Sequence, residues 1–443
     1  MVTEKELLRE RIRAGGGMKD EEFFAEEISR WLSSKKREDM LSGKGYYRGE
    51  QDILKRRRTV ISGGGGVVEV GNLPNNQMVN NLYGCLVDQK KNYLLGKPLT
   101  ILAENKVYEK LLRGILGKKF LRTIKLGGEE ALNCGISWLY PYFGEGEIRF
   151  RLFSGSEICP FWADGGHTEL DCAARVYGEE VYEGREKKQV TRVELYGREG
   201  ISAYTLEGGR LIPQREDPYV KRGEQDLGWG KIPLIPMKYN AGELPLLNRV
   251  RQLQDGYNLI LSDFVNTMEE NVHNTILVLK NYDGTDLGEF RRNLAAYGAV
   301  KTRTVEGASG GVDTLHLEVN GENYRTVLSL LRRGILENGR GFDSFENLGG
   351  GNPNQMNIES RYVGLDLDAN EMETELQAVF EDVLLFVNRF LFLSGKGDFR
   401  GEPVEVLFNR DMLINESEAI ENCVKSVGIL PREVILANHP WSR

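Results

Sequence analysis

The spacing of apolar residues changes several times along the chain and divides it into helical and strand-rich stretches. Residues 21–37 carry apolar side chains at helical spacing between two glycine-rich breaks. A second helix is predicted over Asn75–Leu95, where Gly96 and Pro98 end it. From residue 136 to 237 the pattern becomes short alternating segments bounded by turn residues, which predicts an antiparallel sheet with strands at Ser137–Phe143, Ile148–Phe153, Ala173–Tyr177, Gln189–Tyr196, Ile201–Leu206 and Ile232–Tyr239.

The second half of the chain carries three long helical patterns. Two of them, Pro245–Asn271 and Tyr324–Asn338, enclose an insertion with strand-like pieces, which predicts an antiparallel stalk capped by a small subdomain. A polar, glycine-rich segment over Gly341–Asn354 separates the stalk from the third helix, Gln355–Leu393.

That third helix is expected to be interrupted at Gly364 and restarted by a capping pair, Asp368 with Glu371. A strand at Val404–Phe408 and two short helices, Asn415–Val427 and Pro431–Ala437, complete the chain. The fold class that follows is α+β with several domains.

Composition supports a folded protein. Of 443 residues, 40% are hydrophobic and 28% charged, which excludes wholesale disorder. The most apolar run, Val383–Leu393, is shorter than the roughly 18 residues needed to suggest a membrane span, and the first residues show no apolar signal region. The five cysteines include no C-x-x-C pair, so neither a disulfide framework nor a zinc site is indicated.

The net charge of the chain and its distribution limit how the protein can contact nucleic acid. The net charge of −8 argues against a protein that grips DNA by neutralising many phosphates, although DNA could still pass it. Residues 357–382 include one basic residue, Arg361, and eight acidic residues: Glu359, Asp366, Asp368, Glu371, Glu373, Glu375, Glu381 and Asp382. A solvent-exposed helix face is the simplest explanation of this pattern. The insertion leans basic, with Lys280, Arg291, Arg292, Lys301 and Arg303 against Asp283, Asp286 and Glu289.

No catalytic or metal site emerges from the motifs. The chain has no P-loop, and Gly307–Gly311 matches G-x-S-x-G around Ser309 without the strand before and helix after that a nucleophile needs. Asp366, Asp368 and Asn370 imitate the start of a calcium loop but lack its glycine and final glutamate. The four histidines are scattered. We therefore expect no enzyme activity and no cofactor, with a serine hydrolase at Ser309 as an unfavoured alternative.

Several elements in this order resemble the portal protein, or head-to-tail connector, of tailed double-stranded DNA phages, in the branch common among phages of Gram-positive hosts. The residues that carry the resemblance span almost the whole chain: Tyr46–Leu54, Asn80–Pro98, Ile232–Pro236, Tyr282–Ala299 and Asn438–Trp441. None is a catalytic signature, so the collinear order makes the resemblance specific.

The resemblance implies a division of the chain into named parts. These are an N-terminal arm (1–45), a wing (46–240), a first stem helix (241–271), a clip (272–321), a second stem helix (322–340), a tunnel loop (341–354), a long kinked helix (355–394), a wing strand (395–412) and a crown (413–443). The chain ends two residues after Trp441, earlier than family crowns usually do, so the crown is expected to be truncated.

The resemblance also implies partners and a place of action. The family forms a closed ring, usually a dodecamer, at one capsid vertex of the virion after assembly in the host cytoplasm. Double-stranded DNA passes through the ring, and the terminase large subunit, capsid and scaffold proteins, and a head-completion adaptor bind it. Predicted channel residues are Asn347, Asn352, Asn354, Gln355, Glu359, Asp366 and Asp368, and predicted motor-docking residues are Glu289, Arg291, Arg292, Lys301 and Arg303.

The sequence is physically consistent with such a conduit. An acidic lumen lowers friction on a moving polyanion, whereas a basic one would add phosphate contacts. Amphipathic stalk helices cannot cover both flanks alone, and neighbours in a ring would do so. A phage adaptor or scaffold-binding protein without a lumen stays open as an alternative.

Overall fold

The computed structural model describes most of the chain and separates it into two compact units. The described residues are 3, 5–6, 20–61, 66–69, 71, 73–144, 146–222, 225–273, 276–280, 311–315, 321–343, 355–410 and 415–442. Unit 1 comprises residues 1–50, 81–251 and 335–443, and unit 2 comprises residues 51–80 and 252–334. Residues 51–80, which the sequence groups with the wing, therefore cluster with unit 2.

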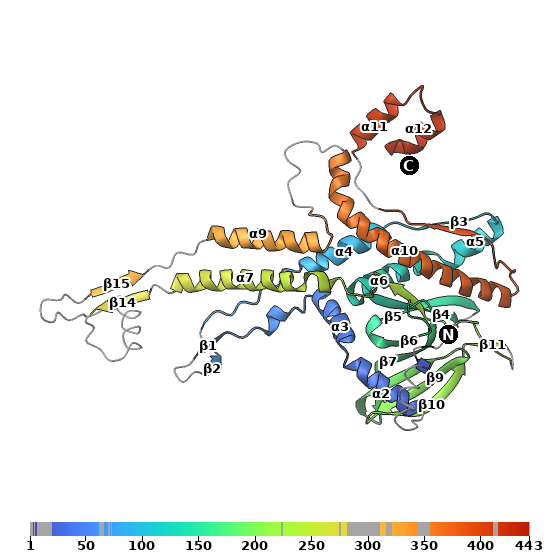
Figure 1. The fold of residues 1–443 in the computed structure, drawn as a ribbon, viewed down its shortest axis with the longest axis horizontal. Coiled ribbons are helices and arrows are strands. Elements are labelled where there is room, and N and C mark those ends of the chain that lie inside the picture. The colour runs from blue at the N-terminus through green and yellow to red at the C-terminus, as the bar shows by residue number, and fades with distance from the viewer. Residues whose placement is uncertain are drawn as a thin grey trace. The chain divides into compact units, whose positions relative to one another are not determined.

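Unit 1 is built on two antiparallel sheets (Figure 1). The larger has the order β10-β9-β8-β7-β6, from Arg210–Pro218, Gly200–Glu207, Glu186–Tyr196, Leu170–Glu183 and Ile158–Trp162. The smaller has the order β13-β4-β5, from Ile235–Lys238, Ile136–Gly144 and Glu147–Phe153. A separate ladder pairs β16 (Val404–Leu407) with β3 (Thr100–Ala103), and β11 (Val220–Arg222) pairs with β12 (Gln225–Leu227). The predicted antiparallel character is confirmed.

The helices of unit 1 are α2 (Asp20–Leu32), α3 (Lys35–Tyr47), α4 (Leu82–Leu95), α5 (Lys106–Ile115), α6 (Lys118–Cys134) and α10 (Gln355–Leu393), followed by α11 (Glu416–Lys425), α12 (Arg432–Asn438) and the short η3 (Pro440–Ser442). Of these, α2, α6 and α10 contact the strands of the two sheets, whereas α11, α12 and η3 pack on one another. No helix in the described ranges is long and apolar enough to cross a membrane.

Two apolar clusters join the sheets to the first helices. In one, Phe23 and Ile28 of α2 pack with Phe161 of β6 and Val193 of β8. In the other, Met40 of α3 packs in a cluster that includes Trp138, Phe153 and Trp162 from three strands. Residues 20–47 therefore lie within the packing of unit 1 and do not stand apart as an arm.

Unit 2 contains most of two long helices and two pairs of short strands. Residues 252–273 of α7 (Leu247–His273) lie beside residues 321–334 of α9 (Gly321–Asn338), and Phe264 contacts Tyr324 with ring centroids 4.9 Å apart. Two hairpins, β1 (Thr59–Ile61) with β2 (Val67–Glu69) and β14 (Ile276–Lys280) with β15 (Gly311–Leu315), belong to this unit (Figure 1). The paired stalk helices are as the sequence predicted.

The long helix α10 differs from its prediction. The helix is continuous through Gly364, and its axis bends near its own N-terminal end (Figure 1). The expected restart at Asp368 is wrong, because this residue lies inside the helix and is 2% exposed. The Asp368 carboxylate is buried among cations, so it does not cap the end of a helix.

The close approach of α3 and α6 depends on one glycine. A Cβ atom added at Gly43 would lie 1.9 Å from the Asn133 carbonyl oxygen, a distance that backbone atoms never tolerate. At Gly45, two residues further along the same helix, the nearest atom would be 3.6 Å away, an ordinary contact. The close packing of α3 on α6 therefore requires glycine at position 43 but not at position 45.

We predict opposite effects for alanine at these two positions. Gly43→Ala should destabilise unit 1 by about 1–3 kcal/mol or more, since the helices must separate. Gly45→Ala should be neutral or stabilise by roughly 0.5–1 kcal/mol through helix propensity, and it serves as the matched control. Differential scanning calorimetry of both variants checks this, and equal shifts of the two melting temperatures would contradict it.

Candidate functional site

The acidic stretch of α10 is the part of the predicted channel that the structure describes best. Glu359, Glu371 and Glu381 are exposed, whereas Asp368 is 2% exposed. A side chain inside unit 1 cannot face an aqueous bore, so the prediction that Asp368 lines a channel was wrong. Its burial raises a different question, namely what balances the charge.

Asp368 is balanced by three hydrogen-bond donors from distant segments. The Lys90 ammonium of α4 donates to Oδ2 at 2.7 Å, and the Tyr239 hydroxyl donates to the same oxygen at 2.7 Å. Arg249, in the first turn of α7, donates to Oδ1 at 2.7 Å, and the Arg340 guanidinium lies 3.5 Å from that oxygen. One carboxylate thus joins four parts of unit 1 that are far apart in the sequence.

The pKa values of this cluster reflect burial and pairing. Burial alone would raise the pKa of Asp368, but Lys90, Tyr239 and Arg249 together hold it below its usual value. Burial lowers the pKa of Lys90 to about 8, and the attraction of Asp368 opposes this only in part. Asp368 is therefore ionised in the folded state at neutral pH.

Three other acids of α10 also have cationic partners. Arg410 contacts Asp366 at 2.8 Å and Glu373 at 2.7 Å, and the Tyr93 hydroxyl also donates to Asp366. Lys231 contacts Asp382 at 2.6 Å. The charge of −7 counted along the segment therefore overstates the field at its surface, because cations from other elements compensate these acids.

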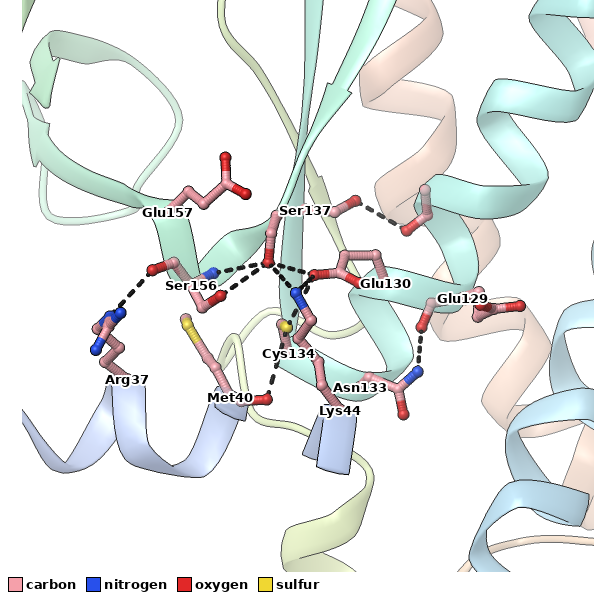
Figure 2. A network of polar contacts seen from close by, with 12 residues as sticks. Arg37, Met40, Lys44, Glu129, Glu130, Asn133, Cys134, Ser137, Ser156 and Glu157 are labelled. Atoms are coloured by element: carbon pink, nitrogen blue, oxygen red, sulfur yellow. Dashed lines mark hydrogen bonds and ion pairs between the residues drawn. The ribbon is translucent and has the colours of Figure 1, made fainter. Parts of the chain in front are cut away.

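A second polar network lies where α3, α6 and the turn after β5 meet (Figure 2). Glu130 of α6 pairs with the Lys44 ammonium at 3.1 Å and accepts a hydrogen bond from Ser154. Lys44 also donates to the Ser154 hydroxyl oxygen at 2.9 Å. These contacts join α3, α6 and the turn after β5.

Arg37 and Cys134 complete this network. Arg37 donates to the Ser156 carbonyl at 3.1 Å, and the Cys134 thiol donates to the Glu130 carboxylate at 3.4 Å. Burial raises the pKa of Cys134, and so does the nearby Glu130, which keeps the thiol protonated and unreactive. The network is structural. Within the described ranges, no group of three potential ligand side chains could hold a metal ion.

Unit 2 contains a row of buried polar side chains on α7. Gln254, Asn258, Ser262 and Asn266 recur every four residues, and none is more than 2% exposed. Residues 76–80 run extended along this row. Three alternate backbone N–H groups of the extended segment donate to it: Asn76 to Asn266 at 2.7 Å, Met78 to Ser262 at 3.0 Å and Asn80 to Asn258 at 3.0 Å. Gln254 donates in return to the Asn80 carbonyl at 2.7 Å.

The spacing of the two elements explains this match. Four helical residues rise about 6.0 Å, and two residues of an extended chain span about 6.6 Å. The side chains of α7 can therefore satisfy every second N–H of the segment, as a neighbouring strand would. Sequence reasoning missed this row, although uncharged polar residues at four-residue intervals in a long helix were a usable signal.

The other predicted site residues cannot be placed. Asn347, Asn352 and Asn354 lie outside the described residues, as do Ser309 and the motor-docking set of Glu289, Arg291, Arg292, Lys301 and Arg303. Gln355 is the first residue of α10.

Comparisons with known proteins cover nearly all of the chain. A model of the family described as phage portal protein, SPP1 Gp6-like, matches residues 33–443. The chain belongs to this family of phage portal proteins. The portal protein of Clostridium phage phiCD119 is 28% identical over 420 residues, which cover 92% of this chain and 90% of that protein. The portal protein of Bacillus phage SPP1 is 28% identical over 427 residues, covering 94% and 83% respectively.

Solved structures with a similar chain include the neck of an empty GTA particle. That alignment has a TM-score of 0.43 and 13% sequence identity, and it covers 82% of this chain and 90% of the other. The portal family and its branch in phages of Gram-positive hosts, predicted from the sequence, are confirmed by the family model and the two relatives. A portal role is favoured over the hydrolase alternative.

In this portal protein, we predict that Asp368→Asn destabilises unit 1 by about 3–5 kcal/mol at pH 7, because Lys90 and Arg249 lose their counter-charge in a buried place. The difference from wild type should shrink as the pH falls. Since the folded pKa of Asp368 is below its unfolded value, its stabilisation is full above the unfolded pKa and disappears as the pH drops through the folded pKa. Chemical denaturation across pH measures this.

Glu381→Gln, at an exposed acid of the same helix, is the matched control and should change the free energy of unfolding by less than about 0.5 kcal/mol. Equal effects of the two substitutions would show that Asp368 is not an essential counter-charge.

For the row on α7, we predict that Asn258→Leu speeds hydrogen exchange at Asn80 and its neighbours. The substitution removes the acceptor of the buried Asn80 N–H, a loss of about 1–3 kcal/mol, and it also removes the donor to the Gln51 side-chain oxygen. Gln252→Leu, at an exposed position of α7, is the control. Unchanged protection over residues 76–80 in Asn258→Leu would refute the role of the row.

Proposed function

We propose that this chain assembles into a closed ring of identical subunits at one vertex of a phage capsid, and that the ring is a channel for double-stranded DNA. Membership of the portal family supports the proposal. The ring places the protein in the virion, with assembly in the host cytoplasm. The subunit number implied by the family resemblance is twelve.

One structural observation supports the proposal that the subunits assemble into a ring. No side chain of α9 between Gly321 and Gly334 is fully buried, although this stretch holds Val327, Leu328, Leu330 and Leu331. One side of α9 packs on α7, where Leu331 comes near Gly256. Large apolar side chains stay exposed on the two helices, namely Leu259, Met268, Val327 and Leu330.

Such a helix pair gains from neighbours on its open flanks. Each subunit has two flanks, so a head-to-tail contact that repeats around an axis closes into a ring. Burial of four large side chains per contact would contribute several kcal/mol, at roughly 1.5–3 kcal/mol for each one fully buried. An adaptor without a lumen would need no repeated contact of this kind.

Within that ring, we propose that the segment 341–354 and the start of α10 line the channel. The set is Asn347, Asn352, Asn354, Gln355, Glu359 and Asp366, from which Asp368 is now removed. Neutral amides and acids suit the passage of DNA of any sequence, because they neither read bases nor hold phosphates. Asp366 keeps only part of its field, since Arg410 is bound to it.

The remaining roles of the proposal concern partners. Glu289, Arg291, Arg292, Lys301 and Arg303 of the clip would dock the terminase large subunit and later a head-completion adaptor, and capsid and scaffold proteins would bind the ring from outside. The chain itself would perform no catalysis and need no cofactor. A serine-directed fluorophosphonate probe should therefore leave Ser309 unlabelled.

We predict that the purified chain forms closed rings and that Leu330→Glu weakens them. Leu330 is 65% exposed on α9, so a charge there should leave the subunit folded but oppose burial in a contact. Ser329→Glu, at the adjacent exposed position, is the matched control and should assemble normally. Native mass spectrometry and negative-stain images measure both. A stable wild-type monomer at micromolar concentration would reject the ring.

A further inference from the structure

Unit 1 carries a groove whose lining includes none of the residues of the polar networks described above. Its volume is about 1080 Å³, and it is bounded by α5, the first turns of α6, the β4–β5 hairpin, the end of α10 and Lys396. Sites for small molecules usually have about 300–1,000 Å³, so this groove can hold a segment of polypeptide.

The helix α5 presents a second apolar row to this groove. Its first row, Tyr108 and Leu112, is buried in unit 1, where the Tyr108 ring stacks on Phe399 at 4.6 Å. The second row consists of Val107, Leu111 and Ile115 at four-residue intervals. Val107 is 66% exposed. The outer side of a surface helix is ordinarily polar, so this row needs a cover that unit 1 does not provide.

The rim of the groove is cationic. One of its lining side chains, Glu147, is acidic, and five are basic: Lys110, Lys118, Lys119, Arg149 and Lys396. Within the described part of the chain, no acid forms an ion pair with Lys110, Lys118 or Lys119. A concentration of positive charge is unexpected in a chain with a net charge of −8.

The start of α6 adds to the positive potential. Its N-cap is Gly117, which has no side chain to accept a hydrogen bond from the first turn. The free N–H groups of a helix start and the helix dipole both favour a carboxylate. Gly117 lines the groove beside Lys118 and Lys119.

We propose that this groove binds an acidic, amphipathic segment of a partner protein. The large apolar side chains of the segment would pack on Val107, Leu111 and Ile115, and its carboxylates would face the lysine rim. This is the helix-in-groove mode of recognition, with anchors every three or four residues. The proposal does not depend on ring formation, because the residues of one unit in one chain form the whole groove.

The apolar row favours a peptide over nucleic acid as the occupant. DNA bound for its charge needs cations that reach phosphates, and an apolar floor contributes nothing to such contacts. An acidic peptide with bulky side chains uses both features of the groove.

The test measures binding of a synthetic peptide to the full-length chain by fluorescence anisotropy. The peptide has about four helical turns, with leucine and phenylalanine on one face and glutamates elsewhere. We expect wild type to bind it at least about tenfold more tightly than a scrambled peptide of equal composition, a difference of 1.4 kcal/mol. Lys118→Glu/Lys119→Glu and Val107→Asp should each lose a similar factor.

Matched controls lie on α6 outside the groove lining. Arg122→Glu reverses one charge at an exposed site, half the change of the double lysine variant, and Leu126→Asp adds a charge at an exposed leucine as Val107→Asp does at an exposed valine. Both should bind the peptide within about twofold of wild type, a difference below 0.5 kcal/mol.

Three results would overturn the proposal. Equal binding of the scrambled peptide, or no binding by wild type, would exclude an amphipathic ligand. A DNA duplex that binds as tightly and responds to the same substitutions would make the groove a polyanion surface. Loss of assembly in the groove variants, with assembly kept in the controls by native mass spectrometry, would make the occupant a second copy of this chain.

Discussion

The constraint on which unit 1 depends is that the charge of Asp368 cannot be buried alone. An isolated carboxylate in a protein interior is costly unless cations and donors surround it. Here the donors come from α4, from the residue after β13, from the start of α7 and from the segment before residue 344. The apolar side of α10 can pack only in the arrangement that also brings these groups together. The cluster therefore selects one arrangement of elements that hydrophobic burial alone would leave less specific.

In unit 2, uncharged side chains provide the hydrogen-bond partners of buried backbone groups. The extended residues 76–80 would bury N–H groups without partners, and none of the strands in the described ranges pairs with them. The polar row on α7 replaces that strand, because a helical step of four residues nearly equals an extended step of two. Each contact is short-range and directional, so the segment is held in one register along the helix. A row of alanines would have allowed the segment to slide.

Local patterns were sufficient for many elements and insufficient for others. Alternation and turn residues predicted β4, β5, β8 and β9 within a few residues, and periodicity predicted α7 and α10, because these signals lie in the elements themselves. Residues 106–134 were not predicted, although they form α5 and α6. The burial of Asp368 could not be predicted either, since its partners are far away in the sequence. Charged residues on a helix indicate a solvated face unless the tertiary structure supplies counter-ions.

The same reasoning changes what a charge count says about a channel. Eight acids on one stretch of α10 suggested an anionic wall, but Asp366, Asp368, Glu373 and Asp382 each bind a cation from another element. These pairs hold α10 in place, and only the exposed acids can act on a passing polyanion. Conversely, Lys110, Lys118 and Lys119 form no ion pair with an acid in the described part of the chain, and they line the same groove as the exposed Val107. Among the described residues, positive charge without ion-pair partners therefore gathers at the groove proposed for a protein partner, whereas fewer acids of α10 stay exposed than the charge count suggests.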